Sequence, residues 1–294
     1  MSVNKIVTKV DGVINKTIDF NDLKSGLAAG SHTITVEAYN GSTLISTQTK
    51  NITIAAVGYD TDYQAVLDYA TTNSIALPTT TQQDLDNQRM VDFKASGAYA
   101  KSDIVFNFES TASVAFKLIC WKRKILAVSY GSPTWSNDGW KGNAANAYID
   151  PLYDTRTAGL NWTLNSAAVI WKSFSISLDG CVTGGFGAGG FTLVAPNRGT
   201  NSYASINGDA KKVDAYSVLG LNMVSRESNA LVKYNNIDKN SSSGTVWAEK
   251  LFLGARNNIV SANIDLYIDE GIGFIAIGGS MFAEYAAIKT AING

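Results

Sequence analysis

Apolar and polar residues alternate along the N-terminal part of the chain, which is the pattern of strands with one buried face. In the segment HTITVEAYN, Ile34, Val36 and Ala38 are separated by polar residues and fall on one side of an extended backbone. The Asn40-Gly41 pair that follows supplies the positive φ angles of a tight hairpin turn. A second alternating segment comes next, so the pattern predicts an antiparallel hairpin.

The spacing of apolar residues changes to that of a helix after Gly58. One helical stripe in the segment DTDYQAVLDYATTN contains Tyr63, Val66, Leu67 and Ala70. Asp60 or Thr61 is placed to accept hydrogen bonds from the free amides at the start of this helix.

A second helix is predicted after Leu77-Pro78, which ends the first. One of the threonines at 79–81 caps it, Gly97 ends it, and the residues expected to face inward are Leu85, Met90 and Phe93. The two helices form a hairpin over residues 58–98. This hairpin is too small to hold a core of its own, so we expect it to pack on a neighbour.

From Asp103 onward the pattern is almost entirely that of strands. Clusters of Gly, Asn, Asp or Ser separate short alternating or apolar segments. The strand candidates are residues 103–108, 114–120, 166–176, 191–196, 217–225, 229–235, 246–255 and 263–278. Their number suits a mainly β fold in which two sheets pack face to face as a sandwich.

Helical spacing returns at the C-terminal end of the sequence. The residues on one side of this predicted helix are Met281, Tyr285, Ile288 and Ile292. Ser280 precedes them and is the expected cap.

The composition is that of a globular protein, with 45% apolar residues, 17% charged residues and a formal net charge of −1. The charges are balanced, and we interpret the short run Lys122-Arg123-Lys124 as a solvated strand end. No apolar segment approaches the roughly 20 residues that cross a bilayer, and the first residues lack the apolar stretch of a signal peptide. We therefore expect no nucleic-acid partner, no membrane insertion and no secretion by the signal-peptide route.

Few residues have the chemistry of a metal or cofactor site. Cys120 and Cys181 lack the spacing of metal ligands, and we interpret both as buried strand residues. The segment from Gly185 to Gly190 matches the pattern G-x-G-x-x-G, but strand candidates lie on both sides of it, so we interpret it as a glycine-rich loop. The sequence predicts no cofactor and no bound metal.

The candidates for catalysis are equally few. A serine or cysteine hydrolase needs a histidine base, and the single histidine, His32, is expected on the surface of the first hairpin. Glycoside hydrolysis needs two carboxylates, and Asp265 and Asp269 fall on one face of a predicted strand, with Tyr267 between them and Glu270 next to them. The set departs from the E-x-D-x-x-E pattern of the sandwich-fold glucanases, so we expect no catalytic residues.

Residues 136–151, SNDGWKGNAANAYIDP, combine Asn and Asp side chains with a Trp and a Tyr, as sugar-binding surfaces do. With the segments YQAVLDYATTNSIALPTTTQQDLDNQRMVDFKASGAYAKSDIVFNF, NWTLNSAAVIW, RESNALVKYNN, LFLGARNN and GFIAIGGSMFAEYAAIKTAI, this stretch resembles a module of structural proteins of tailed bacteriophages. The resemblance covers about residues 59–294 and implies a concanavalin A-like or laminin G-like sandwich. It also implies that residues 139–150 are scaffold: a glycine turn and one strand, with Tyr148 on its inner side and Ile149 on its outer side.

The N-terminal hairpin resembles the last hairpin of a small immunoglobulin-like sandwich. The expected organisation is thus an immunoglobulin-like domain over residues 1–57, the helical hairpin over 58–98, and the sandwich with its C-terminal helix over 99–294. The phage resemblance implies a non-enzymatic virion component, such as a fibre, tail or capsid-decoration protein, that is assembled in the cytoplasm of the host bacterium. Its implied partners are other virion proteins and further copies of itself, with a trimer as a common state of phage fibres.

Two other functions stay open at this stage: a depolymerase that cleaves glycans of the host surface, and an adhesin that only binds them. Loops rich in Asn and Ser, such as residues 235–244, offer adaptable hydrogen bonds for recognition. Tryptophan faces stack on pyranose rings, although we expect most of the six to be core residues. They are Trp121, Trp135, Trp140, Trp162, Trp171 and Trp247.

Overall fold

The computed structural model divides the chain into two compact units, residues 1–58 and residues 59–294. It describes residues 5–10, 13–15, 30–40, 43–54, 58–176, 180–187, 190–198, 201–208, 212–213, 218–245, 250–258 and 260–293. The two units are considered separately.

The described part of the first unit is one antiparallel sheet with the strand order β2-β1-β3-β4. The strands are β1 (Lys5–Val10), β2 (Val13–Asn15), β3 (Gly30–Asn40) and β4 (Thr43–Ile54). The predicted hairpin is β3–β4, in which Asn40 pairs with Thr43 next to the turn. His32 lies in β3 opposite Ile52, but its side chain lies outside the described part. A second sheet is not among the described residues of this unit, so the immunoglobulin-like assignment stays a prediction.

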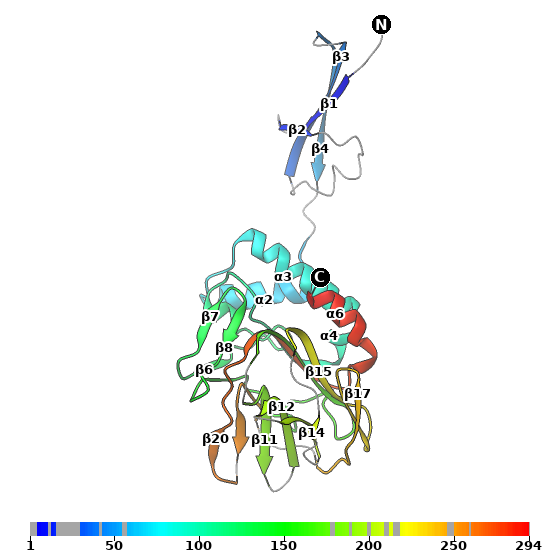
Figure 1. Ribbon diagram of the computed structural model, residues 1–294. Coiled ribbons are helices and arrows are strands. Elements are labelled where there is room, and N and C mark those ends of the chain that lie inside the picture. The colour runs from blue at the N-terminus through cyan, green and yellow to red at the C-terminus, as the bar shows by residue number, and fades with distance from the viewer. Residues whose placement is uncertain are drawn as a thin grey trace. The chain divides into compact units, whose positions relative to one another are not determined.

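The second unit is a sandwich of two sheets with a layer of helices on one of them, as Figure 1 shows. This mainly β, sandwich-like architecture with a short C-terminal helix is the predicted fold class. In the sheet under the helices, called the helix-covered sheet, the described strands follow the order β17-β16-β15-β10-β21-β8-β7, and β5 pairs with β21. Their bounds are β5 (Ser102–Asn107), β7 (Thr134–Ser136), β8 (Gly139–Lys141), β10 (Ala167–Ser175), β15 (Gly220–Arg226), β16 (Leu231–Tyr234), β17 (Ile237–Asn240) and β21 (Gly271–Gly278).

The other sheet, called the opposite sheet, has the described strand order β14-β13-β12-β11-β18-β9-β6, and β19 pairs with β11 and β20. Its strands are β6 (Val128–Tyr130), β9 (Tyr148–Asp150), β11 (Thr183–Gly187), β12 (Gly190–Arg198), β13 (Asn201–Ser205), β14 (Lys212–Val213), β18 (Phe252–Leu253), β19 (Arg256–Asn258) and β20 (Asn263–Asp265). Of the strand candidate at 246–255, the structure describes residues 250–255, and among these only Phe252–Leu253 form a strand, β18.

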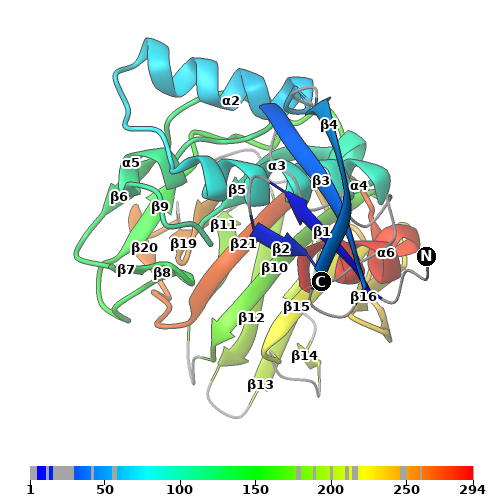
Figure 2. The same ribbon diagram turned by 90° about the horizontal axis from the view of Figure 1, so that it is seen from above.

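The central strands of the helix-covered sheet are buried on both faces. In β10, Val169 and Trp171 belong to the core between the two sheets, whereas Ala168 and Ile170 belong to the core between this sheet and the helices. Strand β10 lies between β15 and β21, as Figure 2 also shows. Burial on both faces explains why the sequence here is a continuous apolar run rather than an alternation.

The helical layer consists of α2 (Thr61–Thr72), α3 (Thr80–Ala95), α4 (Ala98–Lys101) and α6 (Tyr285–Asn293). The whole predicted stripe of α2 is buried, and the Asp60 carboxylate caps this helix by accepting from the amide of Asp62 at 2.9 Å. Thr79 caps α3, whose Met90 and Phe93 are fully buried. These helices therefore belong to the same packed unit as the sandwich.

The prediction that Leu85 faces inward is wrong, because 61% of this residue is exposed. Gln82 and Asp86 continue the stripe of Met90 and Phe93 instead. Both polar side chains form hydrogen bonds, which offset the free-energy cost of burying them. Leu85 therefore lies on the outer side of the helix.

The strand predicted over residues 114–120 is also wrong. The segment forms the short helix α5 (Val114–Lys117), which the Ser113 hydroxyl caps by accepting from the amide of Phe116 at 3.3 Å. It passes between the two cores, so Phe116 contacts the helix–sheet core and Leu118 contacts the inter-sheet core. The segment carries apolar residues on two sides, and the resulting sequence pattern resembles the alternation of a strand.

The predicted cap of the C-terminal helix is wrong as well. The Ser280 hydroxyl donates to Glu227 at 2.7 Å, and a 3-10 turn (Phe282–Glu284) comes before α6. The predicted apolar side is confirmed for Met281, Ile288 and Ile292, which are buried, while Tyr285 is partly buried. No helix of the described residues is both long and apolar enough to span a bilayer.

Replacing Phe93 with Ala is expected to destabilise the second unit by about 3–5 kcal/mol, because a large aromatic side chain is removed from a packed core. Its ring lies 5.2 Å from that of Phe274 in β21 and 6.3 Å from that of Tyr99. Leu85→Ala on the same helix is the matched control, and its effect should stay within about 0.5 kcal/mol. Urea unfolding followed by tryptophan fluorescence reports the second unit, since all the tryptophans lie there. Equal effects of the two substitutions would contradict the burial of this helix face.

Candidate functional site

Asp265 and Asp269, which were predicted to lie on one face of a strand, do not share a strand. The backbone turns at Leu266, whose φ of 52° ends β20 directly after Asp265. The Asp265 carboxylate binds the Arg256 guanidinium through two contacts of 2.7 Å. Asp269 lies beyond this break, before β21 begins. The prediction that Asp265 and Asp269 occupy one strand face is therefore wrong.

The neighbouring Glu270 is fully buried inside the sandwich. Its Oε1 atom accepts hydrogen bonds from the indole of Trp171 at 3.0 Å and from the hydroxyl of Ser173. A substrate in solution has no path to a carboxylate in this position, so Glu270 serves the packing of the two sheets.

Residues 136–151 form a turn and two short strands rather than one strand. Strand β8 belongs to the helix-covered sheet and β9 belongs to the opposite sheet, so this stretch crosses between them. Trp140 is fully buried, and the Asn143 side chain accepts hydrogen bonds from three backbone amides of the crossing, those of Ala145, Asn146 and Ala147. The two sides of β9 are reversed from the prediction: Ile149 is buried in the core, whereas Tyr148 is partly exposed.

Gly139 begins this crossing and has a φ of 141°, a conformation that favours glycine. A Cβ atom there would lie 2.3 Å from the backbone oxygen of Ile272, because β8 pairs with β21 at this point. The Asn143 side chain thus holds the crossing loop in place, and Tyr148 is a partly exposed aromatic residue of this stretch.

The tryptophans do not form a binding surface in the described part of the chain. Trp121, Trp140, Trp162 and Trp171 are at most 3% exposed. Trp135 is partly buried and packs against Phe108, with ring centres 5.9 Å apart. Trp247 lies outside the described residues.

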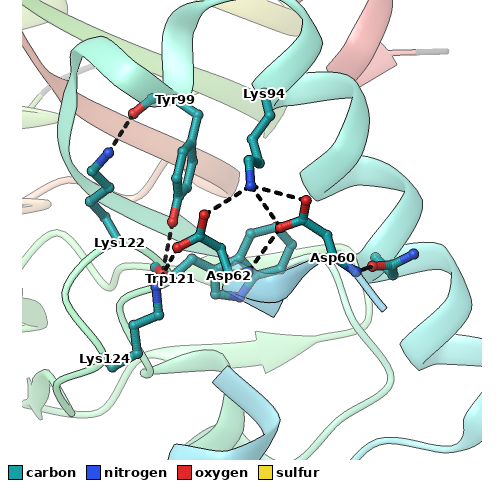
Figure 3. A network of polar contacts seen from close by, with 8 residues as sticks. Asp60, Asp62, Lys94, Tyr99, Trp121, Lys122 and Lys124 are labelled. Carbon is teal, nitrogen blue, oxygen red and sulfur yellow. Dashed lines mark hydrogen bonds and ion pairs between the residues drawn. The ribbon is translucent and has the colours of Figure 1, made fainter. Parts of the chain in front are cut away.

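The basic run at 122–124 lies in a turn and not at a strand end, and each of its side chains has a partner. Lys122 donates to the carbonyl oxygen of Tyr99 at 2.9 Å, and Arg123 donates to that of Leu152 at 2.9 Å. Lys124 forms an ion pair of 2.9 Å with Asp62. Figure 3 shows how these contacts join the turn to the helical layer.

The same network includes Lys94, whose ammonium group binds Asp60 and Asp62 at 2.9 Å each (Figure 3). Partial burial alone raises the pKa of Asp62, but the hydrogen bonds from Lys124 and Lys94 outweigh it and lower this pKa to about 2. The network fastens the start of α2 to α3 and to the turn at 121–124. The ammonium and carboxylate groups of this network form ion pairs with one another.

The remaining sequence candidates have structural positions. Gly185 lies in β11 opposite Thr192, so the glycine-rich segment is part of a hairpin, although residues 188–189 lie outside the described residues. The prediction that residues 235–244 form a loop is wrong for residues 237–240, which form strand β17. Asn235 accepts hydrogen bonds from the amide of Met223 at 2.8 Å and from the Tyr285 hydroxyl at 3.2 Å.

Both cysteines are buried free thiols, as predicted, but neither lies in a strand. Burial raises the pKa of the Cys120 thiol, and it raises that of Cys181 to about 12. The described residues contain no group of three or more His, Cys, Asp and Glu side chains that would hold a metal ion.

A cavity of about 500 Å³ opens between α3, the turn from β7 to β8, and α6. Its lining includes Asp86 and Arg89 from α3, Glu109 from the segment after β5, Lys172 from β10, and Asp138. It combines a concave shape with several ionisable groups, which makes it the candidate site that sequence reasoning missed.

Asp86 lies at the inner end of this cavity and is 2% exposed. Its Oδ1 atom accepts hydrogen bonds of 2.9 Å from the side-chain amides of Gln82 and Asn107, and its Oδ2 atom accepts one of 3.5 Å from Tyr63. Burial raises the pKa of Asp86 to about 6, although the hydrogen bond from Gln82 and the charge of Arg89 act in the other direction. The carboxyl group is therefore poised to exchange a proton near neutral pH.

The cations of the cavity are held by Glu109. Arg89 contacts one oxygen of this carboxylate at 2.8 Å, and Lys172 contacts the other at 2.9 Å. Arg89 also donates to Asn107, and Lys172 donates to the carbonyl oxygen of Ile292 in α6. The cavity wall is thus a chain of mutually satisfied polar groups that ties α3 and α6 to the sheet.

The sequence contains one signal that points to this site. Gln82 and Asp86 occupy the positions where the apolar stripe of α3 should continue, and a buried polar residue at such a position needs a partner. That partner, Asn107, comes from the end of β5, and no local pattern predicts this contact.

No protein-family model matches this chain, and no curated protein matches it in sequence.

Replacing Asp86 with Asn is expected to remove one source of the pH dependence of stability. The Asp86 pKa is about 6 in the folded chain, against about 4 for an unperturbed aspartate, so the carboxyl takes up a proton on folding between these values. Its contribution to the free energy of unfolding therefore falls as the pH rises from about 4 to about 6. Relative to wild type, Asp86→Asn should gain up to about 3 kcal/mol over this window and stay constant above it.

Urea unfolding at a series of pH values measures this difference. Asp62→Asn is the matched control of opposite sign: the wild-type carboxylate, with a pKa of about 2, stabilises the fold above about pH 4 and loses this effect as the pH falls toward 2. An Asp86→Asn difference that does not change with pH would refute the raised pKa.

Proposed function

We propose that the protein is a non-enzymatic structural component of a bacteriophage virion, of the fibre, tail or capsid-decoration type. The order of sequence segments that resembles phage structural modules supports this proposal. So does the sandwich-like architecture of the second unit, a fold that presents loops and sheet faces on a rigid scaffold.

The observation on which the proposal chiefly rests is how the buried carboxylates are used. Asp103 accepts hydrogen bonds from the backbone amides of Leu160, Asn161 and Trp162 at 2.9–3.2 Å, and from the Tyr153 hydroxyl at 2.8 Å. A single side chain thereby fixes the loop before β10. The Asp103 carboxylate therefore has a structural role.

Asp150 has the same kind of structural contacts. One of its oxygens accepts from the amide of Leu152 at 2.8 Å, and the other binds the Lys250 ammonium at 2.8 Å. A catalytic carboxylate instead keeps an oxygen directed at its substrate. The structural contacts of Asp103, Asp150 and Glu270 favour a binding or structural role over turnover.

In this proposal the partners of the protein are other virion proteins and further copies of the chain, with a trimer as the state to be tested first. The protein is assembled in the host cytoplasm and then carried in the particle. A glycan of the host surface is its proposed ligand, and neither nucleic acid nor a membrane is a partner.

Electron microscopy of particles from the phage that encodes this chain is the direct test. Particles labelled with an antibody against residues 59–294 should show the label at repeated, symmetry-related positions on the capsid or the tail. Particles purified from the same lysate that lack the protein by mass spectrometry and bind no antibody would refute a virion role.

A glycan depolymerase is the second candidate, and the cavity under α3 is the observation that favours it. Asp86, with a pKa of about 6, has the property of a general acid, and Glu109 lines the same cavity. We expect wild-type protein to release no reducing ends from bacterial surface polysaccharides. Cleavage that is lost in both Asp86→Asn and Glu109→Gln, but kept in the matched carboxylate variant Asp265→Asn, would establish an enzyme and contradict the structural role.

A further inference from the structure

Four aromatic side chains gather on the opposite sheet, on the side that faces away from the inter-sheet core. They are Tyr130 in β6, Tyr148 in β9, Phe252 in β18 and Tyr267 in the segment between β20 and β21. Tyr148 is the centre of this tyrosine platform, with ring centres 4.7 Å from Tyr130, 5.0 Å from Phe252 and 6.2 Å from Tyr267. The outward position of Tyr148 follows from the burial of Ile149 next to it.

The platform holds one ring flat and open to solvent. Tyr130 is 43% exposed, and its ring lies nearly parallel to that of Tyr148, with an angle of 11° between the planes. One face of Tyr130 thus stacks on Tyr148, and β6 is an edge strand of the described sheet, which is consistent with the exposure of this ring. The ring needs no reorientation when a ligand arrives, because Tyr148 and the strand pairing of Tyr130 with Tyr148 already fix it.

Polar groups surround this apolar surface. Among the described residues, none forms a hydrogen bond with the hydroxyl groups of Tyr130, Tyr148 or Tyr267, so these groups remain available to a ligand. The Lys250 and Asp150 pair lies next to the platform, with the Lys250 side chain 48% exposed. The pair has one charge of each sign and adds no net charge to the surface.

We infer that the tyrosine platform is a carbohydrate-binding site that takes a neutral pyranose, with Tyr130 stacked on the apolar face of the sugar ring. The uncovered ring matches the C–H face of a pyranose, and the phenolic hydroxyls and the Lys250 ammonium match its hydroxyl groups. The absence of net charge favours a neutral sugar over an acidic one. This inference deepens the proposed function and rests on it only for the source of the sugar, a glycan of the host surface.

A second copy of the chain is the competing occupant of this surface. Contacts between protein subunits favour a wide apolar patch whose centre is fully desolvated on association. Here one ring is strongly exposed and one apolar side chain, Val128 of the same strand, is exposed beside it, while phenolic hydroxyl groups and an ion pair make up the other neighbours. Aromatic stacking with directed hydrogen bonds suits a small polyhydroxylated ligand better.

Screening of the full chain on an array of neutral and acidic bacterial oligosaccharides tests the inference, followed by calorimetry with the strongest neutral hit. Wild type should bind neutral members of the array. Tyr130→Ala should lower the affinity roughly tenfold, because a stacked ring contributes about 1 kcal/mol or somewhat more. Tyr130→Phe keeps the ring and should keep most of the binding.

Val91→Ala is the matched control, since it removes an exposed apolar side chain from α3 that does not line the cavity, and its affinity should equal that of wild type. Unchanged far-ultraviolet circular dichroism shows that each variant is folded. Tyr267→Ala, at a second position of the platform, should also weaken sugar binding. No binding by wild type at millimolar sugar, or equal binding by wild type and Tyr130→Ala, would overturn the inference. A dimer in sedimentation that Tyr130→Ala dissociates would overturn it in favour of a contact between copies.

The virion role fails on a different result, absence from particles. A loss of sugar binding with the protein still present in the particle therefore rejects the platform and leaves the proposed function standing.

Discussion

The second unit depends on one constraint, which is that its main sheet has two apolar faces. Strand β10 directs Val169 and Trp171 toward the opposite sheet and Ala168 and Ile170 toward the helices. Such a sheet is stable in water only when both faces are covered, and the helices in turn have no other apolar surface to pack on. The hairpin of α2 and α3 is therefore a layer of the fold rather than a linker.

The borders of this layer are closed by charged groups, and two aspartates show how differently such groups behave. Asp62 faces two ammonium groups and has a pKa of about 2, so it is charged under all ordinary conditions. Asp86 is buried among neutral amides, and its pKa is about 6. The residue type is the same and the distances are similar, but the charge of the donors differs. An ion pair fixes the first border, and a network that responds to protons fixes the second.

Local patterns in the sequence predicted several elements correctly. The stripe of α2, the caps Asp60 and Thr79, and the hairpin of β3 and β4 follow from spacing over a few residues. The prediction of a strand over residues 114–120 was wrong because a segment between two cores has apolar residues on both sides. The break at Leu266 separates Asp265 from Asp269, and no composition signal marks it, since leucine rarely adopts a positive φ.

The sites were harder to predict than the elements. Asp86 meets Asn107 across 21 positions of the chain, and Tyr148 meets Tyr130 and Tyr267 from different strands and loops. Tryptophans were considered as sugar-stacking residues, but Trp121, Trp140, Trp162 and Trp171 are buried and fill space in the cores. The tyrosines reach the surface at positions that strand pairing alone decides. Contacts of this kind depend on the completed fold and leave no trace in a short window of sequence.

The two-faced sheet also determines the smallest piece of the chain that can be excised and handled alone. A fragment that begins at residue 99 would contain every described strand of the second unit together with α6, but it would lose α2 and α3 and with them part of the cover over the helix–sheet core. A bare apolar face of this kind makes a protein aggregate. A fragment that begins at Tyr59 retains all three layers, and it is the natural starting point for crystallisation or for display on an engineered particle.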